Sequence, residues 1–198
     1  MAMSVLQRIC VFCGSNTGSR PAYAAAAREL GHTLAERGIG VVFGGGKVGL
    51  MGVLADAALA VGGEAIGVIP DALVAREIGH NRLTKLHVVS SMHARKTLMA
   101  DLADAFIALP GGHGTFEEFF EAVTWTQLGI HNKPCGLLNV EGYYDALLAQ
   151  LDRAVADGFI HEKNRRLLLD APDVSRLLKK LEAFRPVAAE AGISQAER

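Results

Sequence analysis

The 198-residue chain is poor in cysteine, in net charge and in long apolar runs. Its 3 cysteines do not make a small secreted disulfide scaffold, so we expect free thiols and a cytoplasmic protein. The chain has 20 Lys and Arg against 21 Asp and Glu, so its composition indicates no basic patch for binding nucleic acid or an anionic membrane. Apolar runs such as 53–61 fall far short of the ~20 residues of a membrane span, and the first residues lack a signal-peptide core. We therefore expect a small-molecule partner.

Metal-binding patterns are equally sparse. The 7 histidines show no H-E-x-x-H or comparable ligand spacing, so neither a metal nor any other cofactor is expected. Cys10 and Cys13 have the spacing of half a zinc site or of a redox pair, but no second pair accompanies them. Three-residue spacing on a strand points two side chains to opposite faces, so the pattern favours thiols of the core.

Short apolar, β-branched runs alternate with longer helix-like stretches. Runs that are apolar throughout indicate strands buried on both faces, as in a parallel sheet covered by helices. The alternation predicts an α/β fold, a doubly wound Rossmann-like parallel sheet with helices on both faces, in a single domain over 1–185. Expected strands cover 9–12, 39–43, 65–69, 86–89, 105–109 and 135–140, and expected helices 21–37, 50–61, 91–102, 115–128 and 143–157.

Two segments depart from this alternation. Residues 71–85 are polar and predict a loop or a short helix over the sheet. Residues 186–198 are rich in Ala and Glu without an apolar stripe, and they predict a disordered C-terminal tail.

Glycine is present in excess. The 22 glycines make up about 11% of the chain, against roughly 7% in an average protein. Many of them follow directly after predicted strands. In doubly wound sheets, ligands bind outside the carboxyl ends of the strands, where the strand order reverses, so this edge is where we expect the chemistry.

The first glycine cluster is GGGKVG. Gly44, Gly46 and Gly49 satisfy the G-x-G-x-x-G spacing between a predicted strand and helix. The acidic residue of a dinucleotide site would be Glu64, which precedes the next strand and therefore lies at the wrong edge. The segment is not a Walker loop, because Val48 stands where Ser or Thr must ligate magnesium. A tight turn explains some of these glycines, and backbone donors facing an anion would explain their number.

The second cluster, PGGHGTFEE, begins where a predicted strand ends. Its glycines permit a sharp turn and a close approach of backbone N–H groups to a ligand, and the helix that opens near Thr115 offers a site for phosphate. Thr115 and Glu118 also have the spacing of a capping box, in which the glutamate only reaches back to the cap. Glu117, Glu118 and Glu121 nevertheless place three carboxylates within two turns, so at least one is a candidate for facing the ligand.

The segment Ser91-Met-His-Ala-Arg95-Lys96 opens a helix on the same edge. Two adjacent cations near a helix N-terminus oppose its dipole, and an anionic ligand would remove the conflict; solvated surface charge is the alternative. His113 is the only histidine expected to touch a ligand. Trp125 and the phenylalanines of the next helix indicate core packing or a helix interface, which is compatible with a homodimer.

Taken together, GGGKVGLMG, SMHARK, PGGHGTFEE and WTQLGIHNKP resemble the LONELY GUY family, the cytokinin riboside 5'-monophosphate phosphoribohydrolases. The resemblance covers residues 8–181 and includes the complete PGGxGTxxE signature. It implies a Rossmann-like homodimer that hydrolyses the N-glycosidic bond of a nucleoside 5'-monophosphate to free base and ribose 5-phosphate. Relatives carried the label lysine decarboxylase, but nothing in this sequence marks a lysine for a pyridoxal Schiff base.

The resemblance also implies site residues. The family's catalytic pair falls on Arg95 and Glu118. At two positions, Lys47 and His113, the residue differs from the one that is commonest in the family motifs. Both positions bear on the preference for the base of the nucleotide. The implied nucleotide contacts are Glu77, Lys96, Gly112, His113, Gly114, Thr115 and Thr124, with Ser15, Gly46 and Met92 as further liners.

These residues suggest a mechanism and leave rivals to be tested. Glu118 would stabilise oxocarbenium charge on the ribose and orient its hydroxyls or the attacking water. Arg95 would stabilise the departing base or position the nucleotide, because a guanidinium stays charged. A nucleotide-binding sensor or carrier without turnover is the alternative, and whether the base carries a prenyl group stays open.

Overall fold

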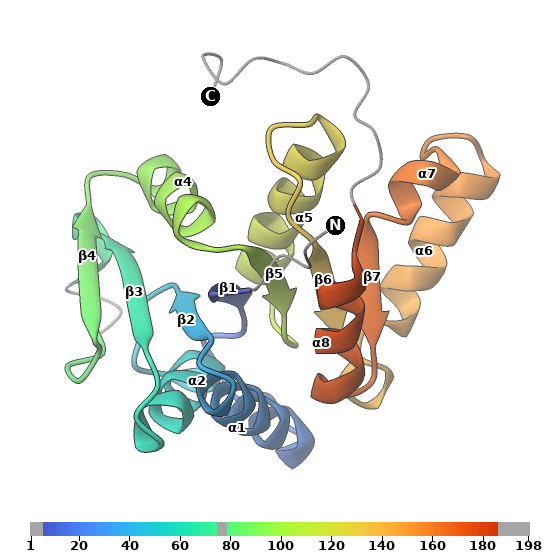
Figure 1. Ribbon diagram of the computed structural model, residues 1–198. Coiled ribbons are helices and arrows are strands. Elements are labelled where there is room, and N and C mark those ends of the chain that lie inside the picture. Colours follow the sequence, from blue (N-terminus) through green and yellow to red (C-terminus); the bar gives the residue numbers. More distant parts are fainter. Residues whose placement is uncertain (1–5, 75–78, 186–198) are drawn as a thin grey trace.

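The computed structural model describes residues 6–74 and 79–185, arranged as one parallel sheet between two layers of helices (Figure 1). The proposed tail, 186–198, lies outside the described residues. The strands are β1 (Arg8–Phe12), β2 (Gly40–Phe43), β3 (Ala65–Pro70), β4 (Lys85–Val89), β5 (Ala105–Ala108), β6 (Cys135–Leu138) and β7 (Leu168–Ala171). The helices are α1 (Pro21–Glu36), α2 (Gly49–Ala60), α3 (Asp71–Val74), α4 (Met92–Leu102), α5 (His113–Gln127), the 3-10 turn η1 (Val140–Gly142), α6 (Asp145–Ala156), α7 (Glu162–Arg165) and α8 (Val174–Ala183).

The strand order, β4-β3-β2-β1-β5-β6-β7, is that of a doubly wound sheet. All of these pairs are parallel. The chain adds strands outward from β1 to β4 and then returns to place β5 on the other side of β1. The topological switch point therefore lies between β1 and β5, where a ligand site is expected beyond the carboxyl ends of the strands.

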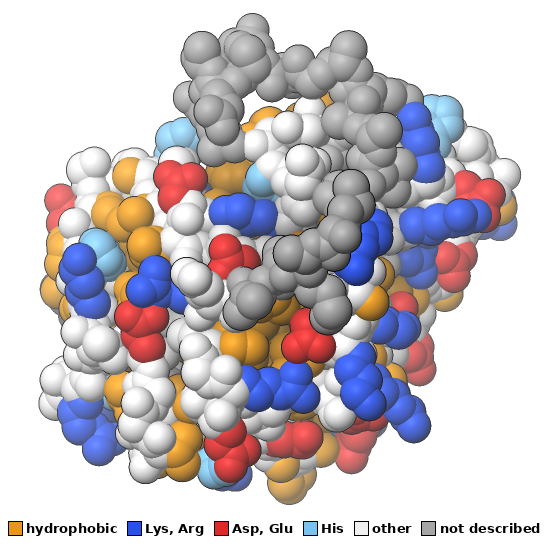
Figure 2. Space-filling model, viewed as in Figure 1, with side chains coloured by type: hydrophobic (Ala, Val, Ile, Leu, Met, Phe, Trp, Pro, Cys, Tyr) orange, Lys and Arg blue, Asp and Glu red, His pale blue; other side chains and the backbone are white. Residues whose placement is uncertain are grey.

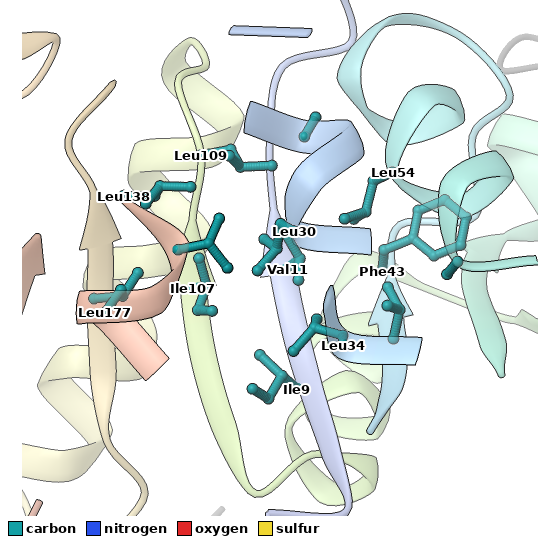
Figure 3. Packing of buried hydrophobic residues seen from close by; sticks show 14 of the residues in the cluster. Ile9, Val11, Leu30, Leu34, Phe43, Leu54, Ile107, Leu109, Leu138 and Leu177 are labelled. Carbon is teal, nitrogen blue, oxygen red and sulfur yellow. The ribbon is translucent and has the colours of Figure 1, made fainter. Parts of the chain in front are cut away.

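Two hydrophobic layers cover the two faces of the sheet. On one face α1, α2 and α8 pack over alternate strand residues; Figure 3 shows Leu30 and Leu34 of α1 near Ile9 and Val11, and Leu177 of α8 near Ile107 and Leu138. On the other face α4 and α5 cover the intervening strand residues, with Met99 and Phe119 fully buried. Successive residues of a strand point to opposite faces of the sheet and therefore enter opposite layers. Because both faces are covered, the strand runs are apolar throughout.

The structure corrects the expected elements in four places. The edge strand β4 is largely exposed, with Val88 at 57% exposure, so uniform burial holds for the inner strands only. The expected helix at 115 begins at His113, and the one at 143 begins at Asp145. The sequence interpretation stopped at residue 157 and missed β7 and α8, although α8 carries a leucine stripe whose Leu177, Leu178 and Leu181 are buried.

Candidate functional site

The site lies at the switch point, where the loops after β1 and β5 touch. The backbone N–H of Gly14 donates to the carbonyl of Pro110 (3.1 Å), and the N–H of Leu50 donates to the carbonyl of Gly14 (3.0 Å). These two bonds join the loop after β1 to the glycine turn and to α2. Beside them opens a cavity of about 220 Å³, whose lining includes Ser15, Tyr23, Gly112 and Tyr143. Ser15 therefore lies at the switch point, and its contact with a nucleotide stays a prediction.

The glycine turn leads directly into α5. Gly112 is the N-cap and has no side chain to cap the helix, and His113 is the first helical residue. Thr115 is thus the third residue of the helix and not its cap, so the capping-box interpretation of Thr115 and Glu118 is wrong. Because the N-cap residue makes no side-chain bond to this end, the N–H groups of the first turn are candidate donors for an anion.

The glycines of this turn serve different purposes. A Cβ on Gly111 would lie 2.1 Å from Thr115 Oγ1 and 2.9 Å from the backbone nitrogen of Gly14, so close packing requires glycine there. A Cβ on Gly112 or Gly114 would meet nothing within 4 Å. Internal packing therefore does not explain Gly112 and Gly114, which are exposed beside His113 at the mouth of the site.

Two tyrosines brace the turn, and sequence reasoning missed both. The hydroxyl of Tyr144, which is 1% exposed, donates to the carbonyl of Leu109 (2.6 Å), and the hydroxyl of Tyr143 donates to the carbonyl of Gly111. Burial raises the pKa of Tyr144, so it remains a donor across the working pH range. The GYY triplet after a predicted strand was the available signal, but its two partners are 32 and 35 residues away, and only the fold brings them together.

Arg95 is buried at the start of α4 and is held by backbone carbonyls. Its Nε donates to Val68 O and its Nη2 to Gly44 O, each at 3.0 Å, and its Nη1 lies 3.8 Å from the sulfur of Met92. A guanidinium that is 6% exposed and bonded to two carbonyls is held in one position. The alternative of a solvated surface charge is therefore wrong for Arg95.

Lys96 points across to α5, where it meets acidic partners within the chain. Its Nζ lies 2.6 Å from Glu117 Oε1 and 2.9 Å from Glu121 Oε1. Partial burial lowers the pKa of Lys96, but the hydrogen bonds and charges of Glu117 and Glu121 outweigh it and the net shift is upward. The conflict between this cation and the helix dipole is thus relieved by the protein itself, and a nucleotide contact at Lys96 stays a prediction.

Glu118 lies half-buried between α4 and α5. It lines a narrow crevice with Phe12, Lys96 and Trp125. Burial raises the pKa of the Cys10 thiol well above its usual value; the Glu118 carboxylate raises it further and the Arg95 guanidinium opposes it. Both charged groups therefore lie within electrostatic reach of the same thiol in β1, and their joint role in catalysis stays a prediction.

The GGGKVG loop is shaped largely by internal packing. A Cβ on Gly44 would lie 2.1 Å from Arg95 Nη2, and one on Gly49 would lie 2.2 Å from the carbonyl carbon of Ser15. Gly46 pairs with Gly79 in an isolated antiparallel bridge. The close contacts explain Gly44 and Gly49 without an anion, and Gly46 as a nucleotide contact remains a prediction. Glu64 forms an ion pair with Arg8 at the amino edge of the sheet, as expected.

The other predicted site residues are dispersed. Met92 is 44% exposed at the N-terminus of α4. Thr124 is exposed in the second half of α5 and donates to the carbonyl of Phe120 (2.7 Å). About ten residues separate it from the start of α5, or roughly 15 Å along the axis. Glu77 lies outside the described residues.

The cysteines are core thiols, as predicted. Cys10 packs on the α4 and α5 face, and Cys13 packs on the opposite face. Burial raises the pKa of all three thiols, that of Cys135 to about 12.

In the described part of the chain, no group of three or more His, Cys, Asp or Glu side chains is placed to hold a metal ion. Within 6–74 and 79–185, no helix combines the length and apolar character needed to cross a bilayer.

Comparison with known proteins places the chain among enzymes. A family model described as "Possible lysine decarboxylase" matches residues 51–181. The cytokinin riboside 5'-monophosphate phosphoribohydrolase LOG7 of Arabidopsis thaliana is 51% identical over 183 residues, which span 92% of this chain and 84% of the relative. The phosphoribohydrolase LOG of Oryza sativa subsp. japonica is 52% identical over 183 residues, 92% of this chain and 76% of the relative.

Solved structures share the architecture at lower identity. The molybdenum cofactor binding protein of Rippkaea orientalis has a TM-score of 0.69 and 22% identity, covering 91% of this chain and 98% of that chain. The molybdenum cofactor carrier protein of Chlamydomonas reinhardtii has a TM-score of 0.67 and 23% identity, covering 89% and 98%. At this identity they show the fold alone.

Fold and site define a doubly wound, Rossmann-like α/β protein with its candidate site at the topological switch point. The sequence relatives identify the family within this fold class. The chain belongs to the LONELY GUY family of phosphoribohydrolases, as its motifs indicated.

Proposed function

We propose that this protein hydrolyses the N-glycosidic bond of adenosine 5'-monophosphates, including N6-modified ones, and releases the free base and ribose 5-phosphate. The observation that supports the proposal is the uncapped N-terminus of α5 at the switch point, with the half-buried Glu118 on that helix and the buried, carbonyl-held Arg95 on α4. The relatives at about 50% identity are named for this activity.

The phosphate is proposed to dock at the glycine turn. Gly112 and Gly114 leave the first N–H groups of α5 accessible, and the helix dipole favours negative charge there. The cavity beside Ser15 and the loop after β1 provides the space. Binding energy realised at the phosphate, remote from the reacting carbon, holds the ribose in place for the reaction.

The reacting carbon is C1' of the ribose. As its bond to the base nitrogen breaks, positive charge develops on the ribose, and the Glu118 carboxylate stabilises that charge. The water oxygen joins C1', one water proton leaves, and the departing base nitrogen gains a proton. Arg95 remains charged throughout and positions the nucleotide or stabilises the departing base.

A lysine decarboxylase activity has less physical support. A lysine that forms a Schiff base needs a lowered pKa, whereas that of Lys96 is raised by its two carboxylate partners.

The face drawn in Figure 2 mixes basic and acidic side chains without a broad basic patch among the residues described, which supports a small ligand over nucleic acid.

We also propose a cytoplasmic homodimer that uses the outer surface of α4 and α5. A cavity of about 650 Å³ opens there, and its lining includes His93, Thr97, Trp125 and Ile130. Light scattering on the purified chain tests this proposal: twice the mass of the chain is expected, and a monomer at micromolar concentration would refute it.

The activity is tested by incubating the protein with adenosine monophosphate and with its N6-isopentenyl analogue and measuring free base by chromatography. Release from neither nucleotide would refute the proposal, and binding with the nucleotide recovered intact would favour a sensor or carrier. Glu118→Gln should lower kcat by about 10² or more. Glu117→Gln is the matched control, since Glu117 is half-exposed on the same helix and Glu121 remains beside Lys96.

A further inference from the structure

The turn η1 has a constrained backbone, and this backbone directs a tyrosine side chain to the candidate site. Glu141 adopts a left-handed conformation (φ 50°, ψ 34°), which non-glycine residues rarely adopt, and Gly142 follows at φ 71°. The side chain of Asn139 holds the turn from inside, because its Oδ1 accepts from the N–H of Tyr144 (2.7 Å) and its Nδ2 donates to Asp145 (2.7 Å). A strained turn that is stabilised in this way fixes the direction of the side chains that follow it.

The side chain that this turn presents is Tyr143. Its ring packs edge-on against Tyr23 (centroids 5.5 Å apart) and against Tyr144 (4.9 Å), so it has a defined orientation although it is 36% exposed. Its hydroxyl donates to the carbonyl of Gly111, and the ring lines the cavity at the switch point together with Gly112. A purely structural tyrosine would more commonly bury its ring, as Tyr144 does.

The bond to Gly111 controls a donor of the proposed phosphate site. The peptide group between Gly111 and Gly112 is planar and trans, so the Gly111 carbonyl and the Gly112 N–H point in opposite directions. By holding the carbonyl, Tyr143 also sets the direction of the Gly112 N–H. Both residues are glycines with wide backbone freedom, and without this bond the peptide group could rotate.

We propose that Tyr143 is a positioning residue for phosphate recognition: it orients the Gly111–Gly112 peptide group so that the N–H of Gly112 faces the phosphate of the substrate. This inference rests on the proposed function, because the anion is taken to be the phosphate of that substrate. It concerns a residue that the motifs did not single out. The ligand chemistry at this subsite is a phosphate monoester, as in ribose 5-phosphate.

The test is Tyr143→Phe, which removes the hydroxyl and keeps the ring. Calorimetric titration with ribose 5-phosphate should show affinity falling about 5-fold to 10-fold, as for the loss of one neutral hydrogen bond, while the affinity for adenine stays within 2-fold. With the nucleotide as substrate, KM should rise by a similar factor and kcat should change little.

Thr84→Val is the matched control. The Thr84 hydroxyl accepts from the N–H of Ala65 (3.1 Å) at the amino edge of the sheet, so this variant also loses a side-chain to backbone bond, but away from the site. It should bind both ligands as the wild type does. Unchanged ribose 5-phosphate affinity in Tyr143→Phe, or equal losses for ribose 5-phosphate and adenine, would overturn the inference. Because titration needs no turnover, an inactive wild type that still binds ribose 5-phosphate would refute the hydrolase alone.

Discussion

Replacing each glycine of the turn after β5 by alanine should separate packing from ligand binding. At Gly111 the new Cβ would lie 2.1 Å from Thr115 Oγ1, 2.7 Å from Thr115 Cβ and 2.9 Å from the backbone nitrogen of Gly14. Thr115 is 4% exposed and has little room to move, and the third contact is with backbone. Gly111→Ala must therefore displace the turn or the loop after β1.

The expected cost follows from these contacts. Overpacking of this kind typically lowers the free energy of unfolding by about 1–3 kcal/mol. For a domain of this size, 1 kcal/mol shifts Tm by about 2–4 °C, so we expect Tm to fall by roughly 2–12 °C. Thermal unfolding followed by circular dichroism measures this directly. Base release should fall as well, because the displaced turn carries the proposed phosphate donors.

Gly112→Ala and Gly114→Ala provide the contrast. Neither new Cβ meets an atom within 4 Å, and Gly112 has a negative φ of −103°. Stability should change little at Gly112 and rise by up to about 1 kcal/mol at Gly114, where alanine favours the helix. If ligand access explains these glycines, KM should rise about tenfold or more in both variants, equivalent to about 1.4 kcal/mol of lost binding. Unchanged stability in Gly111→Ala, or unchanged KM in the other two variants, would refute this reasoning.

Three further predictions concern charged and thiol side chains. Arg95→Lys keeps the charge but cannot reproduce the two bonds to Val68 and Gly44, so kcat/KM should fall by about 10-fold to 100-fold in the base-release assay, and retained activity would contradict the role of geometry. Lys96→Met should lower stability by less than about 1 kcal/mol in urea unfolding, because Glu117 is 56% exposed and solvent screens the pair; a larger loss would mean that the pair is structural. Burial raises the pKa of Cys135 from 9.0 to about 12, so this thiol stabilises the fold below pH 9 and loses that contribution as the pH rises toward 12. Between pH 9 and pH 10, Cys135→Ala should therefore lose about 1 kcal/mol less stability than the wild type, and equal losses would contradict the assigned cause.

Several features were predictable from the sequence because they depend on local pattern. Continuous apolar runs identified the inner strands, Pro21 stands at the start of α1 as expected, and the glycines of PGGHG mark the carboxyl edge of β5. The pairing of Arg8 with Glu64 places Glu64 at the amino edge of the sheet, as its position before β3 predicted. These conclusions need only the periodicity of strands and the polarity of a parallel sheet.

Other features depend on segments that are distant in the chain. Thr115 and Glu118 have the spacing of a capping box, but the helix starts two residues earlier, because helix boundaries respond to the packing of the turn as well as to local signals. No spacing rule could connect Tyr143 to Gly111, or Lys96 to Glu117, since these pairs form only when α4, α5 and η1 gather at one edge of the sheet.

The sequence by itself determined the fold class and the family, and it predicted the edge of the sheet that carries the candidate site, because strand burial, glycine positions and motif order are properties of the chain. Only the tertiary structure decided what each side chain does there: that Arg95 is held by carbonyls, that Lys96 is already paired, and that tyrosines brace the glycine turn. The physical reason is that hydrogen bonds and ion pairs depend on distances of a few ångströms between residues far apart in sequence, which local pattern does not specify.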